Sequence, residues 1–175
     1  MSFCHRALAL FLLLPSLAVA QQPPTPSLRF LVGNAGYIFA GTVQRVERID
    51  LSDPNGVPTI QVTFHVDRAM RGVRTGQMLT IREWARLWDA GERYRVGEHM
   101  VLFLYRPSKL GLTSPVNGPY GRFQTNPDGS LPLDRGRLAG LQMAGIGEVQ
   151  RRRGPAEVVI SPRALSRAVR RAVEE

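Results

Sequence analysis

Cysteine is almost absent from this sequence, since its 175 residues contain only one, Cys4. Cys4 lies in the N-terminal stretch MSFCHRALALFLLLPSLAVA, which has one arginine, then an apolar run, then small residues at its end. This order is typical of a secretory signal peptide that is cleaved after Ala20, so that the mature chain begins at Gln21. Without Cys4, the mature chain has no disulfide, no thiolate nucleophile and no thiolate metal ligand.

Long hydrophobic runs are lacking as well. The rival interpretation of the N-terminal stretch is a membrane anchor, but its apolar part, residues 7–14, is too short to cross about 30 Å of hydrocarbon. No later stretch has the length and apolar character of a transmembrane span. We therefore predict an exported protein, secreted or periplasmic, that has no transmembrane span.

Lysine is scarce, because Lys109 is the only one among 23 basic residues, against 14 acidic residues and a formal net charge of +9. An arginine-dominated composition rich in alanine and glycine is typical of GC-rich bacterial genomes, so the charge alone does not indicate a binding function. Nucleic-acid binding has little support, since the protein is predicted to be exported and aromatic residues make up only 7% of the chain.

Alternation of apolar and polar residues is the main pattern that is present. It predicts antiparallel strands at 37–48, 59–70 and 78–84, joined by turns rich in glycine and proline. Gly41 indicates a bulge or a sharp bend in the first of these strands. Shorter strands are expected at 111–116 and 121–125. Five or six short strands at this spacing predict a small barrel, closed or partly open.

The stretch VGEHMVLFLY, residues 96–105, raises the question of whether Glu98 and His99 belong to an active site. Beyond His99, apolar residues occupy both alternating faces, which predicts a central strand that is packed on both sides. Gly97 and Glu98 then form the turn that enters the strand. We therefore interpret His99 as a half-exposed or hydrogen-bonded residue rather than a ligand.

Helical patterns are expected at both ends of this β region. A short helix is predicted at 27–35, with Ser27 as its N-cap. Residues 133–149 have a weaker helical spacing that glycines interrupt. Residues 161–175 are the strongest helix, with Ser161 and Pro162 suited to its first positions. The predicted organisation is a signal peptide at 1–20, a Pro-rich linker at 21–27, an OB-like β-barrel domain at 28–125 and a helical C-terminal extension at 126–175.

The order of IFAGTVQRVE, VTFHVDRAMRG, YRVGEHMVLFLY and GLTSP followed by GRF resembles a known family. It is similar to the OB-fold domain of the tissue inhibitor of metalloproteinases and of netrin-like modules, particularly the cysteine-poor bacterial versions. The resemblance covers about residues 28–125. It implies an OB-like β-barrel and an exported binding or regulatory role. Together with the helical patterns above, the predicted fold is mainly β, with a five- to six-stranded OB-like barrel and C-terminal α-helices. The animal inhibitors chelate the protease zinc through a mature N-terminal cysteine, and Gln21 stands at that place here.

Catalytic and metal-binding chemistry has little support in the sequence. A metal site would require His65, His99 and a carboxylate such as Asp67 or Glu98 to converge, and the histidines lack zinc-ligand spacing. A glycosidase needs two carboxylates at a set separation, which the sequence leaves open. Four carboxylates are candidates for that pair: Glu83, Asp89, Glu92 and Glu98. Arginines next to them favour a solvated charged surface, so we predict no catalytic residue, no cofactor and no metal.

Two sets of residues are candidates for binding surfaces. Trp84 and Trp88 lie four residues apart and form either an aromatic platform or the seal of the barrel end. The basic face of the C-terminal helix is a candidate contact for an acidic partner or an anionic membrane surface. This face consists of Arg163, Arg167, Arg170 and Arg171. The alternative is that the apolar face of the helix docks on the barrel and the arginines are only solvated.

The sequence as a whole favours an exported, non-enzymatic binding or regulatory module. The first alternative is a cysteine-free inhibitor of a secreted metallopeptidase, and a weaker one is a carboxylate-based hydrolase. The expected partner is an unidentified protein, with a secreted peptidase or an anionic surface among the candidates.

Overall fold

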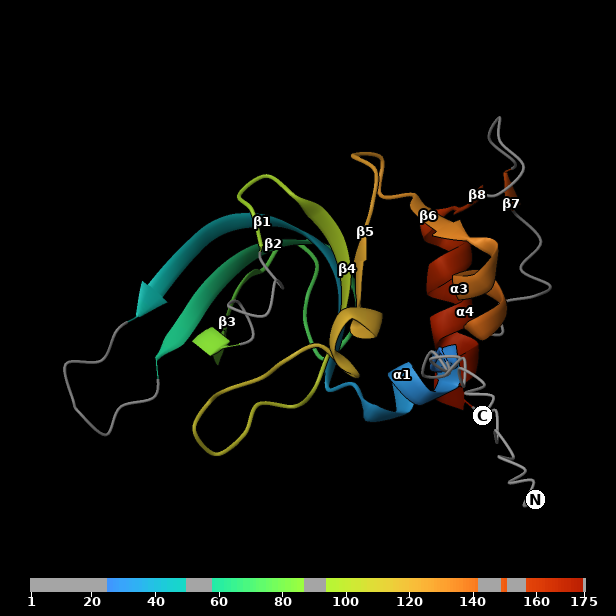
Figure 1. Ribbon diagram of the computed structural model, residues 1–175. Helices are drawn as coiled ribbons and strands as arrows, with labels where there is room; N and C mark the ends of the chain where they lie inside the picture. Colours follow the sequence, from blue (N-terminus) through green and yellow to red (C-terminus); the bar gives the residue numbers. More distant parts are fainter. Residues whose placement is uncertain (1–24, 50–57, 87–93, 142–148, 151–156, 175) are drawn as a thin grey trace, which may run out of the picture.

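The computed structural model of the protein describes residues 25–49, 58–86, 94–141, 149–150 and 157–174 (Figure 1). The fold is mainly β, as predicted, with a five-stranded antiparallel sheet and a C-terminal helix. Its strands are β1 (Tyr37–Ile49), β2 (Thr59–Arg71), β3 (Met78–Trp84), β4 (His99–Leu104), β5 (Arg122–Gln124), β6 (Leu131–Asp134), β7 (Val149–Gln150) and β8 (Glu157–Ile160). Its helices are α1 (Leu28–Asn34), the 3-10 helix η1 (Gly118–Gly121), α3 (Arg135–Gly140) and α4 (Pro162–Glu174).

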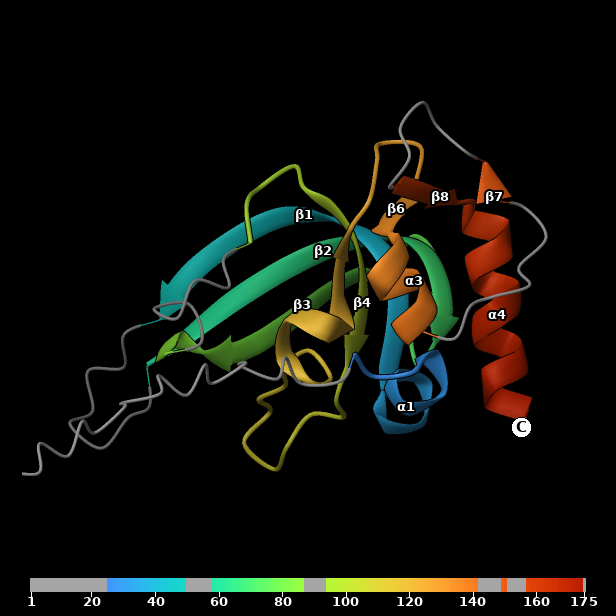
Figure 2. The same ribbon diagram turned by 45° about the vertical axis from the view of Figure 1, so that its right-hand side comes forward.

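The first five strands form one sheet in the order β3-β2-β1-β4-β5. Every pair of neighbours is antiparallel, and β1 and β2 form its longest hairpin. Figure 2 shows this hairpin curving away from α4. The predicted strands at 37–48, 59–70 and 78–84 are therefore confirmed to within a residue at each end, because their alternation is a local property of the sequence.

β4 is the central strand that its sequence predicts. It lies between β1 and β5, and all its residues after His99 are buried. Val101 and Phe103 belong to one hydrophobic cluster, whereas Met100 and Leu102 belong to the other. The turn before it also forms as expected, since the Glu98 N–H donates to the Arg95 carbonyl and Gly97 has a φ of 87°. The apolar run in VGEHMVLFLY is thus a buried strand.

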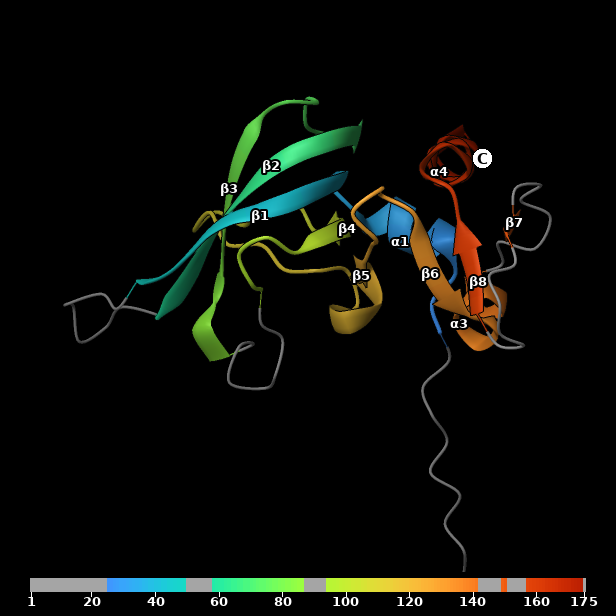
Figure 3. The same cartoon turned by 90° about the horizontal axis from the view of Figure 1, so that it is seen from above.

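Two hydrophobic clusters lie on the two faces of this sheet. The first joins one face of β1, β4 and β5 to α1, β6, β8 and α4. The second is formed by the other face of β1 to β4 together with Tyr94. Figure 3 shows α4 and the β6–β8 strands on the same side of the molecule as α1. The C-terminal residues therefore pack on the sheet through a shared core.

The ladders of the described strands do not close into a barrel. The segment 111–116, which was expected to be a strand, forms only isolated bridges: Leu112 pairs with Arg82 of β3, and Pro115 pairs with Leu104 of β4. A continuous ladder is prevented here because proline has no N–H to donate. Gly111 also has a φ of 72°, which turns the chain away from an extended strand.

The segment 126–175 was expected to be helical, and that expectation was incomplete. α4 forms as predicted, and the Ser161 hydroxyl accepts a hydrogen bond from the Ala164 N–H in its first turn. However, β6, β8 and β7 form a second, three-stranded antiparallel sheet. Of the helix expected at 133–149, the described residues contain only α3, which Asp134 caps by accepting from the Arg137 N–H. The strands of this sheet are too short for alternation to reveal them.

Candidate functional site

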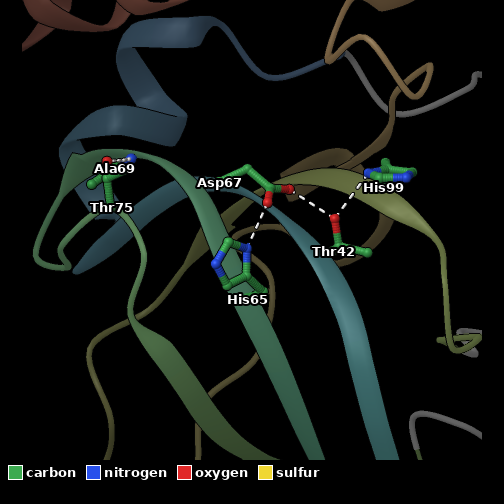
Figure 4. A network of polar contacts seen from close by, with 6 residues as sticks. All are labelled: Thr42, His65, Asp67, Ala69, Thr75 and His99. Atoms are coloured by element: carbon green, nitrogen blue, oxygen red, sulfur yellow. Dashed lines mark hydrogen bonds and ion pairs between the residues drawn. The ribbon is translucent and has the colours of Figure 1, made fainter.

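Thr42 lies in the middle of a row of polar residues that crosses three strands. It pairs with His65 of β2 on one side and with His99 of β4 on the other. Neighbouring strands are about 4.8 Å apart, so directly paired residues can bring their side chains into contact. Figure 4 shows the side chains of these residues gathered on one face of the sheet.

A bulge in β2 brings Asp67 to this row. Gly41 of β1 pairs with Val66 and Ala40 pairs with Arg68, so Asp67 has no partner on β1. A bulged residue is redirected relative to its neighbours, and such bulges recur next to binding sites. A bulge or sharp bend was predicted in β1 at Gly41, and the register does shift there, but the extra residue lies on β2. A side chain at Gly41 would not fit, because its Cβ would lie 2.7 Å from the His65 carbonyl oxygen.

Three hydrogen bonds connect the four side chains of Thr42, His65, Asp67 and His99, which we call the polar row. The Thr42 hydroxyl donates to Asp67 Oδ2 at 2.8 Å, and Asp67 Oδ1 lies 2.8 Å from His65 Nδ1 (Figure 4). His99 Nδ1 lies 2.9 Å from Thr42 Oγ1. The two histidines are thus held at fixed positions by one carboxylate and one hydroxyl.

The direction of each proton in the polar row follows from its chemistry. An ionised carboxylate only accepts hydrogen bonds, so His65 Nδ1 must carry the proton that it shares with Asp67. The single Thr42 hydroxyl proton is directed to Asp67, so the contact with His99 is made by a proton on His99 Nδ1. In neutral histidines both Nε2 atoms then keep a lone pair. The polar row therefore offers acceptors at both of its ends.

A hollow of about 230 Å³ adjoins the polar row where the sheet meets the C-terminal residues. Ten residues line it: Ala40, Gly41, Asp67, Arg68, His99, Thr125, Pro127, Asp128, Gly129 and Pro162. Its outer wall is the loop 125–129, which is fixed to β4 because the Thr125 N–H donates to the His99 carbonyl. Asp128 Oδ1 accepts from both the N–H and the hydroxyl of Ser130, which holds the tip of this loop.

The predicted basic face of α4 is exposed along its whole length. Arg163, Arg167, Arg170 and Arg171 are all exposed. The opposite face of the helix, with Leu165 and Val169, is buried in the first hydrophobic cluster. The apolar face is therefore occupied by the protein's own core, and the arginine face is the one exposed to solvent.

The other predicted site residues are not brought together among the described parts of the chain. Trp84 is 50% exposed at the end of β3, whereas Trp88 and the cleavage point at Ala20 and Gln21 lie outside the described residues. Glu83 is buried and accepts from the Tyr94 hydroxyl at 2.8 Å. The remaining carboxylate candidates are either structural or not described: Glu98 accepts from the Arg95 N–H in a turn, and Asp89 and Glu92 lie outside the described residues.

His65, Asp67 and His99 do share one network, in which His65 contacts Asp67 directly and Thr42 links His99 to Asp67. Within the described residues, no group of three or more histidine, cysteine, aspartate or glutamate side chains is arranged to hold a metal ion. Thr42 and Arg68 were missed by the sequence analysis. Alternation places Thr42 on a strand, but its neighbours across the sheet depend on registers that three bulges or irregularities shift.

No protein-family model, curated protein or solved structure matches this chain. No helix within the described ranges has the length and the apolar character needed to cross a membrane.

Proposed function

We propose that this chain is an exported, non-enzymatic binding or regulatory module with a metalloproteinase-inhibitor-like OB fold, and that its ligand site is the hollow beside the polar row. The observation that carries the fold is the pair of bridges made by Leu112 and Pro115. They connect one end of the β3-β2-β1-β4 series back to the other through residues 112–115. A partly open five-stranded barrel is the arrangement of the OB fold.

The proton directions in the polar row favour binding over nucleophilic catalysis. In a hydrolase that uses a hydroxyl nucleophile, the imidazole accepts the proton of that hydroxyl. Here the Thr42 proton is directed to Asp67, and His99 donates to Thr42 instead of accepting from it. The oxygen of Thr42 is thus engaged on both sides. The polar row is suited to hold fixed acceptors in place for a ligand.

The basic face of α4 is the second contact surface in this proposal. Its four arginines are exposed on a helix whose other face is buried in the core. Such a face is complementary to an acidic partner or an anionic surface.

Export is tested by the N-terminus of the protein recovered from its native host. We expect sequencing to begin at Gln21, or to be blocked there by cyclisation of that glutamine. Detection of intact Met1 in cytoplasmic protein would contradict export and would return Cys4 to the functional chain.

Binding is tested with the mature protein as bait for periplasmic extract, followed by mass spectrometry. We expect a partner that the wild-type bait captures and that the Asp67→Asn bait captures at least about tenfold less, because a charged hydrogen-bond acceptor is lost. Arg74→Gln is a control for a substitution elsewhere on the surface, since Arg74 is exposed in the β2–β3 turn and does not line the hollow. Equal capture by the Asp67→Asn and Arg74→Gln baits would contradict a site at the polar row.

The identity of the captured protein separates the remaining alternatives. A peptidase whose activity falls on addition of the mature protein favours the cysteine-free inhibitor. Turnover of a captured substrate that disappears in His99→Gln favours the hydrolase and contradicts the non-enzymatic proposal.

A further inference from the structure

We propose that the hollow binds a small zwitterion of the α-amino acid class, with its ammonium group on the polar row and its carboxylate on Arg68. This inference rests on the proposed function, since it names the ligand class of the same site. Three features of the hollow carry it: outward-facing acceptors, an adjacent cation and a small volume.

The acceptors are Asp67 and the Nε2 atom of His99. All three donated protons of the polar row point inward toward Asp67 or Thr42, so the row has no further proton to offer a ligand in its neutral-histidine form. Among the described residues, none donates to His99 Nε2. Each oxygen of Asp67 receives one hydrogen bond and has capacity for another. A ligand at this end of the hollow must therefore bring protons, as an ammonium group does.

The cation is Arg68, which the β2 bulge directs to the same side as Asp67. Val66 and Ala69 pack in the second hydrophobic cluster, whereas the two residues between them are exposed. Consecutive residues of a regular strand point to opposite faces, so this pairing of Asp67 with Arg68 requires the bulge. No hydrogen bond or ion pair within the described residues engages the Arg68 guanidinium. A carboxylate is the anion that its planar fork binds in a bidentate manner.

The size of the hollow limits the ligand to a single small unit. Its volume of about 230 Å³ lies below the range of about 300–1,000 Å³ for sites that hold drug-sized ligands. Its walls are fixed: Gly41 leaves no room for a side chain, and the loop 125–129 is hydrogen-bonded to β4. Asp128 also lines the hollow, where its Oδ1 accepts two hydrogen bonds from Ser130. The acceptors of Asp67 and His99 beside the Arg68 cation fit a small molecule that carries both charges a few bonds apart.

The test is an NMR titration of the mature protein with L-alanine, which carries the zwitterionic head common to α-amino acids. We expect saturable shifts of the amide signals of Gly41, Arg68 and His99. Two compounds of nearly the same shape each retain one charge: isobutyrate keeps the carboxylate, and isopropylammonium keeps the ammonium group. Each should bind at least about tenfold more weakly than L-alanine, because one charge-assisted contact is lost.

Substitutions assign the two ends of the ligand. Arg68→Gln should weaken L-alanine binding about tenfold without weakening isopropylammonium binding, since it removes a like charge from beside the ammonium group. Asp67→Asn should weaken the binding of both about tenfold. Arg74→Gln is the control for lost positive charge and should bind L-alanine as the wild type does. All three variants should fold, because the substituted side chains are exposed. Dispersed amide signals in their spectra check this.

Three results would overturn the inference. Isobutyrate that binds as tightly as L-alanine would make the hollow a simple anion site. L-alanine affinity that does not change in Arg68→Gln would place the ligand elsewhere. Saturation with L-alanine that produces no shift at Gly41, Arg68 or His99 would exclude this ligand class. A partner whose capture still depends on Asp67 would leave the proposed function standing in each case.

Discussion

Phe103→Ala is expected to lower the free energy of unfolding of the mature protein by about 3–5 kcal/mol, the usual cost of removing a fully buried phenylalanine side chain. Phe103 is 1% exposed and packs edge-to-face on Phe123, with ring centroids 5.9 Å apart. It lies in the cluster that joins β4 to α1 and α4. The total free energy of unfolding of a domain is about 5–15 kcal/mol, so this loss is a large part of it. Urea denaturation followed by circular dichroism measures the loss.

Phe30→Ala is the matched control, since it removes the same side chain from a different environment. Phe30 is 46% exposed on the outer side of α1, so the expected loss is about 1 kcal/mol or less. Similar losses for the two variants would mean that β4 is not packed against α1 and α4 on the face that carries Phe103. That outcome would also remove the support for the proposed role of His99 in the polar row, because the position of His99 at the start of β4 depends on this packing.

The parts of the fold that depend on local pattern could be predicted from the sequence. Alternation identified β1 to β4 because each of these strands buries one side or both over six or more residues. The cap of α1 was also predictable, since Ser27 accepts from the Phe30 N–H. β6 and β8 are four residues long, which is too short for alternation to distinguish them from loop. A strand was expected at 111–116, but the strands that Leu112 and Pro115 bridge depend on tertiary contacts, which alternation does not report.

The candidate site was beyond prediction for a related reason. His65, Asp67 and His99 were recognised as chemically capable residues, but His99 joins the other two through Thr42, a residue common in any strand. Their proximity follows from one extra residue in β2, which brings Asp67 within reach of Thr42. A shift of one residue moves a side chain to the other face of a sheet, so the site is a property of strand register.

Replacing Arg167, Arg170 and Arg171 of α4 with glutamine is expected to reduce binding to anionic vesicles by about 100-fold, since each arginine near such a surface contributes about 1 kcal/mol. These side chains are exposed, whereas Leu165 and Val169 of the same helix are buried in the core. The helix therefore has no free apolar stripe to insert among lipid chains, and its contact with the surface is electrostatic. Sedimentation with vesicles containing phosphatidylglycerol measures the effect.

Salt dependence and a charge-matched control distinguish this contact from attraction by the overall positive charge of the protein. Binding of the wild type should weaken steeply between about 0.01 M and 0.15 M salt, as the screening length falls from about 30 Å to about 8 Å. Replacing Arg74, Arg106 and Lys109 with glutamine removes the same charge from exposed positions outside α4 and should reduce binding much less. Equal losses in the two triple variants would mean that the whole charge, and not α4, attracts the surface. Binding that ignores both salt and the α4 substitutions would exclude the arginine face as a contact.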